Sequence, residues 1–189
     1  MSPQRTISSV YQDPLEIVWV ATAKSFGIEV VRDPHVFASW DGDGTLRIGD
    51  ATSLDADDSL AQMIFHELCH ALIEGPDGFE LPDWGLDITN QAQRVHEHAC
   101  LRLQAALAIR YGLREFLAAT TNSRLYYDAL PPDPLSDEND PAVSLALDGW
   151  QRATAGPWAN DLDGALRVTA SLADLIRPYV VKDSLWSRD

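Results

Sequence analysis

The feature of this sequence that most constrains the fold is the string His66-Glu67-Leu68-Cys69-His70, which has the form HExxH. On an α-helix, two histidines four residues apart lie on one face, and the glutamate lies about 100° around from the first of them. Two imidazoles at this spacing can bind one zinc ion, while the carboxylate stays close enough to act on water. The motif therefore carries this chemistry only if the segment is helical.

The residues around the motif have the pattern of an amphipathic helix over residues 59–74. The segment SLAQMIFHELCHALIE contains no glycine or proline, and its apolar residues recur at helical spacing. An acidic cluster, Asp55, Asp57 and Asp58, precedes it and is expected to supply N-cap oxygens and negative charge for the helix dipole. Gly75-Pro76 is expected to end the helix.

Two histidines at this spacing can also occur by chance, as capping or packing residues without a metal. The chain has five histidines, and two of them stand in one HExxH string inside an otherwise apolar helix. Burying two imidazoles and a carboxylate without partners would be costly. A metal site is therefore the preferred interpretation.

A catalytic zinc site takes three protein ligands and leaves its fourth position to water. The third ligand is expected from His96-Glu97-His98, within a second helix over residues 91–111. Because neighbours on a helix diverge by about 100°, only one or two of these three can face the first helix. Glu97 lies near the apolar side of the second helix and is the preferred ligand, and His96 and His98 remain alternatives.

The HELCH string followed by Glu97 on a helix resembles the gluzincin class of zincin metallopeptidases. The segment EHACLRLQAAL is similar to the glutamate helix of the ImmA/IrrE group and of other minimal gluzincins, and the likeness covers roughly residues 14–115. It implies an α+β, zincin-like fold: an N-terminal helix, a small three-stranded sheet with an edge strand over the cleft, the HExxH helix and the glutamate helix. It also implies Zn²⁺ held by His66, His70 and Glu97, with Glu67 as general base.

Two departures from the family's pattern bear on these expectations. Larger gluzincins carry an aspartate four residues after the glutamate, where this chain has Leu101, so some other acid is expected to orient a ligand imidazole. The Leu-Leu-Met-Pro ending common in ImmA/IrrE proteins is absent, and no DNA-binding helix-turn-helix is apparent. The second departure argues against a role in cleaving repressors.

The residues before the metal helix are expected to form one helix and three short strands. Asp13-Pro14 is typical of a helix start, and the apolar run that follows is expected to end at Gly27. Strands are expected over residues 28–32, 36–40 and 45–49. The last of them stands directly before the metal helix and is the expected edge strand, where an extended peptide can bind through backbone hydrogen bonds.

The segment Asp41-Gly42-Asp43-Gly44 between the last two strands has two interpretations. It is a hairpin turn signal, and it is also a fragment of a calcium-binding loop. The full calcium pattern would place Ser39 and Asp50 at its first and last positions, where Asp and Glu are expected. A plain turn is therefore preferred.

The 189 residues are expected to form one metallopeptidase-like domain, since 46% hydrophobic and 23% charged residues are ordinary for a globular protein of this length. Residues 14–115 would be the zincin core. Residues 116–180 would be a C-terminal helical part. After a proline-rich stretch, two helices are expected there, PAVSLALDGWQRAT and DLDGALRVTASLADLIRPY, and they are expected to form a layer that closes the cleft from one side.

The net charge of −15 argues against nucleic acid as a partner, because phosphate binding needs a basic surface. Acidic residues concentrate near the expected cleft, at residues 33–58 and 74–90, which indicates either solubility or attraction of a cationic peptide substrate. The N-terminal residues have no apolar run typical of a signal peptide, and no segment is long and apolar enough to span a membrane. A cytoplasmic protein without a membrane partner is expected.

Several side chains near the expected site have more than one interpretation. Cys69 and Cys100 fall on the two metal helices. They are either free thiols, a disulfide or zinc ligands. The loop of residues 75–90 is either an ordinary connection with Trp84 buried as packing, or a lid over substrate with Asp83 or Asp87 beside a ligand histidine. A hydrogen-bond donor to the oxyanion is expected from a downstream tyrosine, and Tyr127 is chosen.

The sequence thus predicts a zinc metallopeptidase that hydrolyses peptide bonds, with Glu67 taking a proton from water and passing it to the leaving amine. The competing hypothesis is a non-catalytic metal-binding regulatory or interaction protein that retains the same site. The geometry of the metal site separates the two hypotheses. A catalytic site keeps an open position facing a cleft, whereas a structural zinc is closed by a fourth protein ligand.

Overall fold

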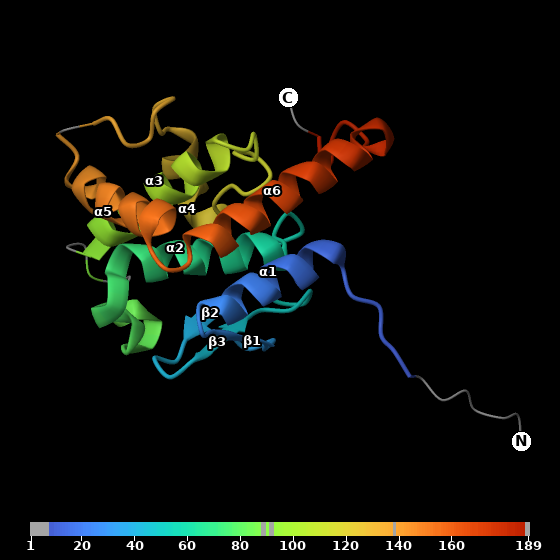
Figure 1. The fold of residues 1–189 in the computed structure, drawn as a ribbon, viewed down its shortest axis with the longest axis horizontal. Coiled ribbons are helices and arrows are strands. Elements are labelled where there is room, and N and C mark those ends of the chain that lie inside the picture. Colours follow the sequence, from blue (N-terminus) through green and yellow to red (C-terminus); the bar gives the residue numbers. More distant parts are fainter. Residues whose placement is uncertain (1–7, 88–89, 91–92, 138, 188–189) are drawn as a thin grey trace, which may run out of the picture.

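The computed structural model describes residues 8–87, 90, 93–137 and 139–187 (Figure 1). In these residues the chain forms six α-helices and one three-stranded sheet, so the fold is α+β. The helices are α1 (Pro14–Ser25), α2 (Leu60–Phe79), α3 (Arg94–Ile109), α4 (Thr121–Asp128), α5 (Pro141–Ala155) and α6 (Ala159–Ile176). The strands are β1 (Glu29–Arg32), β2 (Ala38–Trp40) and β3 (Thr45–Ile48), and the short 3₁₀ turns are η1 (Pro82–Gly85) and η3 (Arg177–Tyr179).

The sheet has the order β1-β3-β2, with β3 parallel to β1 and antiparallel to β2. The prediction that β3 is the edge strand is therefore wrong. The hairpin turn pairs one side of β3 with β2, and the chain entering from α1 places β1 on the other side. Leu46 and Ile48 of β3 have no exposed surface, as expected for the central strand under a helix. The free edges belong to β1 and β2.

The turn between β2 and β3 is stabilised locally, as the plain-turn interpretation expects. The Asp41 carboxylate accepts hydrogen bonds from the backbone N–H groups of Asp43 (2.8 Å) and Thr45 (2.9 Å). Gly42 has a φ of 77°, which favours glycine. A Cβ at Gly42 would lie 2.9 Å from the backbone of Leu81, so the hairpin also packs tightly against the chain leading into η1.

The start of α1 agrees with the prediction, because Asp13 accepts hydrogen bonds from the N–H groups of Leu15 and Glu16. The start of α2 differs from the prediction. Its N-cap is Ser59, which accepts from the Gln62 N–H while the Gln62 side chain accepts from the Ser59 N–H. This capping box replaces the acidic cap expected from the preceding aspartates.

The first helical run of α2 stops at Gly75, as expected, where φ is 68° and ψ is −162°, and a second short run follows across this kink to Phe79. Pro76 has no N–H, so it cannot bond the carbonyl of Leu72 one turn earlier. Arg152 of α5 supplies the missing donor, with one guanidinium nitrogen 2.7 Å from the Leu72 oxygen and 2.9 Å from the Ile73 oxygen. The kink thus ties α2 to α5.

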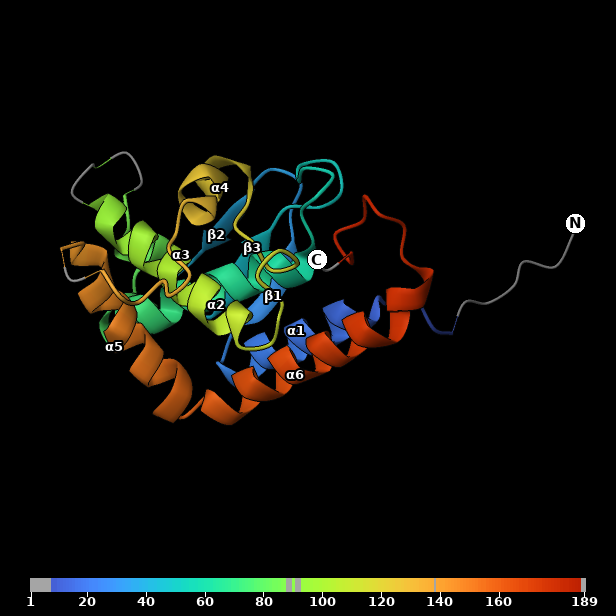
Figure 2. The same ribbon diagram turned by 90° about the horizontal axis from the view of Figure 1, so that it is seen from above.

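Helix α2 runs through the middle of the molecule, with α1 and the sheet on one side and α3, α4 and α5 on the other (Figures 1 and 2). Helix α5 packs on α2 and α3, and α6 returns along α1. Buried residues of α1, α2, α3, α5, α6 and the sheet form one hydrophobic core. No helix in the described part of the chain is long and apolar enough to cross a membrane.

Replacing Arg152 by Met is expected to lower the free energy of unfolding by about 2 kcal/mol, because it leaves two carbonyl oxygens at the kink without a charged donor. Urea denaturation gives this value. The matched control is Arg177→Met, since Arg177 makes an exposed pair with Asp174 and is expected to contribute less than about 0.5 kcal/mol. Equal losses in the two variants would contradict the role assigned to Arg152.

Candidate metal centre

Helix α2 places His66 and His70 one turn apart, with their Nε2 atoms 3.2 Å from each other and their rings nearly perpendicular. Glu97 approaches both from α3. Its Oε2 is 3.2 Å from His70 Nε2, and its Oε1 is 3.7 Å from His66 Nε2. Two imidazole nitrogens and one carboxylate thus converge at the interface between α2 and α3.

The two histidines beside Glu97 have other partners. His96 Nδ1 is 2.9 Å from both carboxylate oxygens of Glu74, on the outer part of the α2–α3 interface. The His98 ring stacks on Tyr126, with ring centroids 3.7 Å apart. Of the three neighbours on α3, Glu97 is therefore the residue that contacts both histidines of the HExxH motif.

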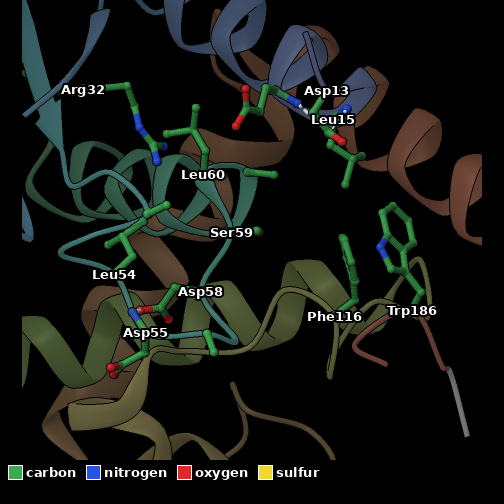
Figure 3. A pocket seen from close by; sticks show the side chains of 14 residues that line it. Asp13, Leu15, Arg32, Leu54, Asp55, Asp58, Ser59, Leu60, Phe116 and Trp186 are labelled. Atoms are coloured by element: carbon green, nitrogen blue, oxygen red, sulfur yellow. Dashed lines mark hydrogen bonds between the residues drawn. The ribbon is translucent and has the colours of Figure 1, made fainter. Parts of the chain in front are cut away.

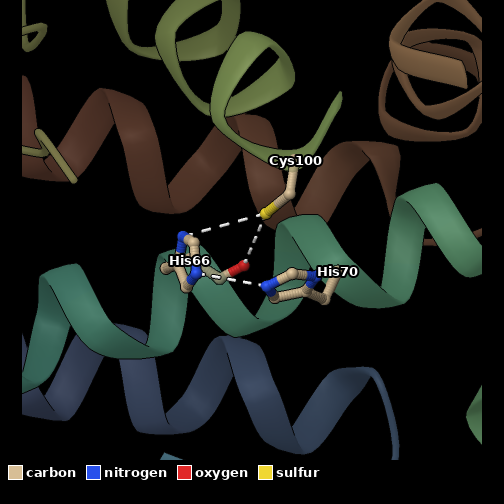
Figure 4. A group of neighbouring side chains, drawn as sticks. All are labelled: His66, His70 and Cys100. Carbon is tan, nitrogen blue, oxygen red and sulfur yellow. Dashed lines mark hydrogen bonds between the residues drawn. The ribbon is translucent and has the colours of Figure 1, made fainter. Parts of the chain in front are cut away.

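A second group overlaps the first: His66, His70 and Cys100 lie close enough together to hold a metal ion (Figure 4). Cys100 extends from α3 toward His66, with its sulfur 3.7 Å from His66 Nδ1 and 3.5 Å from the His66 carbonyl oxygen. Cys69 and Cys100 are both buried free thiols, which agrees with the first of the three interpretations of the cysteines. Burial raises the pKa of the Cys100 thiol, and the neighbouring Cys69 raises it further.

The side chain that orients His66 is Gln104 of α3, whose Oε1 is 2.9 Å from His66 Nδ1. Gln104 is completely buried, and its amide nitrogen donates to the Leu117 carbonyl at 2.8 Å. That second bond fixes which end of the amide faces the imidazole, so His66 Nδ1 carries the proton and donates it to Gln104. The lone pair of His66 Nε2 then points toward Glu97 and His70.

An acid was expected in this orienting role, and the structure places an amide there for His66. Gln104 follows Glu97 by two turns on the same face of α3, and this spacing is the sequence signal that could have identified it. His70 differs from His66, because its buried Nδ1 has no hydrogen-bond partner in the described part of the chain. Asp83, one of the two expected partners, instead accepts from the Trp40 backbone N–H at 3.1 Å.

The electrostatics of His70 and Glu97 are coupled. Burial alone would lower the pKa of His70, but the hydrogen bond and charge of Glu97 outweigh it and raise that pKa to about 8. Burial would raise the pKa of Glu97, but the hydrogen bond from His70 and the charges of both histidines hold it well below its usual range. This carboxylate therefore favours positive charge beside it, which a proton or a divalent cation can supply.

Glu67 is buried, with 7% of its surface exposed. Its Oε2 accepts a 2.8 Å hydrogen bond from the indole nitrogen of Trp84. The Glu67 carboxylate thus faces a neutral indole, whereas the Glu97 carboxylate faces two imidazoles. The sequence interpretation of Trp84 as packing missed this contact, because nothing local in the sequence links residues 67 and 84.

A cavity of about 550 Å³ opens beside these residues. Its walls come from β2, α2, α3, α4 and the chain between η1 and α3, and much of the lining is apolar. The residues that line it are Phe37, Ala38, Met63, His66, Glu67, Leu86, Gln93, Arg94, Glu97, His98, Leu101, Thr120, Ser123 and Tyr126. Helices α5 and α6 contribute no lining residue among those described. The expected closure of the cleft by the C-terminal helices is therefore wrong, and α4 takes that place.

Tyr127, the expected oxyanion donor, is not among the residues that line this cavity. It is completely buried in a separate apolar cluster, and its hydroxyl donates to the Arg114 carbonyl at 2.9 Å. Burial raises the pKa of Tyr127. Its neighbour Tyr126 forms part of the cavity wall, but the Tyr126 hydroxyl is bound to Arg102 at 2.9 Å. The structure thus does not bring Tyr127 to the two histidines.

A second cavity, of about 370 Å³, lies between the start of α1, the loop before α2 and the C-terminal residues (Figure 3). Its charged lining residues are Asp13, Glu16, Arg32, Asp55 and Asp58, and its apolar lining includes Leu15, Phe116 and Trp186. None of the described acids of residues 33–58 or 74–90 lines the cavity beside His66, although these acids were expected near it. Some of them line the second cavity instead.

Comparison of the chain with protein-family models, with curated proteins and with solved structures found no match. Function is therefore inferred from the geometry of the site.

Glu97→Ala is expected to weaken zinc binding by more than about 100-fold, because it removes a carboxylate that contacts both histidines, and loss of merely supporting partners costs about 10- to 100-fold. Competition with a chromophoric chelator at neutral pH measures the affinity. His96→Ala and His98→Ala are the controls, since those rings contact Glu74 and Tyr126, and each should change affinity less. A larger loss in either control would remove Glu97 from the ligand set.

Gln104→Met is expected to weaken zinc binding by about 10- to 100-fold, because His66 loses the acceptor that fixes its tautomer and orientation. Gln62→Met is the matched control: Gln62 is also a buried glutamine whose amide donates to a backbone carbonyl, that of Ala118, but its Oε1 accepts from the Ser59 N–H rather than from a histidine. Both variants should lose stability, whereas only Gln104→Met should lose affinity. Unchanged affinity in Gln104→Met would contradict the orienting role.

Proposed function

We propose that this chain is a zinc metallopeptidase of the gluzincin type, which hydrolyses peptide bonds. The observation that carries the proposal is the convergence of His66 Nε2, His70 Nε2 and the Glu97 carboxylate, within 3.2–3.7 Å of one another, at the wall of a cavity that Glu67 also lines. Two imidazoles and one carboxylate are a ligand set that zinc uses in hydrolases. Glu67 is then the base beside the metal.

The ligand set of His66, His70 and Glu97 fits zinc better than the set that includes Cys100. Gln104 accepts a hydrogen bond from the Nδ1–H group of His66. This leaves Nε2 as the ligand atom, and Nε2 faces Glu97 and His70. Cys100 lies on the Nδ1 side of the same ring. A metal bound between Cys100 and His66 Nδ1 would have to break the bond to Gln104. His66, His70 and Glu97 would therefore hold the ion.

When bound, zinc supplies Lewis acidity, because it polarises the scissile carbonyl and lowers the pKa of a coordinated water toward about 7. Glu67 takes a proton as the water oxygen attacks the carbonyl carbon, and it passes that proton to the amine as the carbon–nitrogen bond breaks. Trp84 holds Glu67 Oε2, so the other carboxylate oxygen is the one available for proton transfer. Ser123 donates to Glu97 Oε1 at 3.1 Å and keeps that carboxylate in place.

The substrate proposed is a peptide or protein segment with an apolar side chain near the cleaved bond. The cavity wall beside the ligands is formed by Phe37, Met63, Leu86, Leu101 and the ring of Tyr126. Burial of an apolar side chain against such a wall is favourable by about 25 cal/mol per Å². This lining supports an uncharged side chain there, rather than the cationic one that was an alternative from the acidic composition.

The proximity of Cys100 favours one competing function, a non-catalytic protein that binds zinc for stability or partner recognition. If Cys100 joined His66, His70 and Glu97, the four protein ligands would close the site and leave no position for water. Cobalt substitution separates the cases, because a thiolate ligand adds a sulfur-to-metal charge-transfer band that a site of nitrogen and oxygen ligands lacks.

The proposal is tested by comparing wild type with Glu67→Gln. Both are expected to carry about one zinc per chain, since Glu67 is not a ligand. Wild type should cleave members of an unbiased peptide library read by mass spectrometry, and Glu67→Gln should lose nearly all of that cleavage. A zinc-loaded wild type that cleaves no peptide, with a cobalt form that shows the sulfur band, would refute the proposal and support the non-catalytic function.

A further inference from the structure

We infer that Trp84 is a positioning residue for Glu67: its indole N–H holds one carboxylate oxygen and thereby aims the other at the cavity. This inference rests on the proposed function, because it assigns a role in the reaction to a side chain outside the ligand set. The contact that carries it is the 2.8 Å hydrogen bond from Trp84 Nε1 to Glu67 Oε2, between side chains that are 3% and 7% exposed.

The chemistry of the pair restricts Glu67 to one orientation. An indole nitrogen can only donate a hydrogen bond, so the oxygen that faces it must accept. A hydrogen bond to a carboxylate is shorter and stronger than a bond between neutral groups. Rotation of the Glu67 carboxylate would break this bond in a place where water has little access. One oxygen is thus fixed, and in the described part of the chain the other has no hydrogen bond and belongs to a side chain that lines the cavity.

The indole itself is held by an aromatic cluster that joins three elements. The Trp84 ring stacks on Trp40 of β2, with centroids 4.7 Å apart and planes at 4°, and meets the edge of Phe79 at the end of α2. The Trp40 indole donates to the Phe79 carbonyl at 3.0 Å, and the Trp40 backbone N–H donates to Asp83. The position of Trp84 is therefore set by β2, α2 and η1 together.

The backbone at this position is strained. Asp83 and Trp84 are the non-glycine residues with positive φ in the described chain, at 47° and 59°. A bulky residue seldom adopts this left-handed conformation, and it persists only where the surroundings impose it. Packing alone does not require an indole on a left-handed backbone. The strain is accounted for if the conformation is what brings Nε1 to the carboxylate.

The test compares Trp84→Phe with Trp40→Phe. Each change deletes one indole N–H from the same stacked pair, but only that of Trp84 contacts Glu67. Trp84→Phe is expected to lower kcat by about 10- to 100-fold with KM within about twofold and zinc content unchanged, because misplacement of a reacting group costs rate rather than binding. Trp40→Phe should lower kcat far less. Equal decreases in the two variants would overturn the inference.

A second measurement does not depend on hydrolysis or on folding of the Trp84 variant. The indole N–H resonance of Trp84 in ¹H–¹⁵N NMR spectra of the full chain should move upfield in Glu67→Leu, while that of Trp40 should stay nearly fixed. An unmoved Trp84 resonance would overturn the inference whatever the activity. If the resonance moves but zinc-loaded wild type cleaves no peptide, the hydrogen bond is supported and the proposed function fails. The role of Trp84 in catalysis then fails as well.

Discussion

The arrangement of the molecule depends on burying two imidazoles and a carboxylate between α2 and α3. Polar groups of this kind are costly inside a protein unless each has a partner, so the neighbouring elements must supply partners. Glu97 contacts His66 and His70, and Gln104 accepts a hydrogen bond from His66. Gln104 is anchored in turn on the Leu117 carbonyl, in the chain leading to α4. The positions of α3 and of the chain before α4 are thus tied to the two histidines.

A second constraint comes from the far end of α2, where the helix bends at Gly75. Beyond that bend, Phe79 and then Trp84 pack against Trp40 of the sheet. Arg152 satisfies the carbonyls that the bend leaves free, so α5 supports the site without lining the cavity. Groups far from His66 and His70 therefore help to hold the Trp84 indole against Glu67.

The sequence predicted most of the features whose cause is local, although the capping box of Ser59 and Gln62 was missed. The cap at Asp13, the helical run around His66 and the turn at Asp41 all depend on residues within a few positions of one another, and each is found in the structure. Strand order is a non-local property, and alternation in β3 could not show that it lies between two partners. The roles of Gln104 and Trp84 also went unrecognised, because their partners lie on other elements.

The two glutamates of the site show how one kind of side chain is directed to two tasks. Glu97 receives hydrogen bonds or charge from His66, His70 and Ser123, so both of its oxygens face groups that favour the ionised carboxylate. Glu67 receives one bond from a neutral indole on one oxygen. A carboxylate engaged at both oxygens is suited to remain ionised as a ligand, whereas a carboxylate held at one oxygen keeps the other for a proton. In the proposed mechanism, it is therefore the surroundings, rather than the residue type, that make Glu97 the ligand and Glu67 the base.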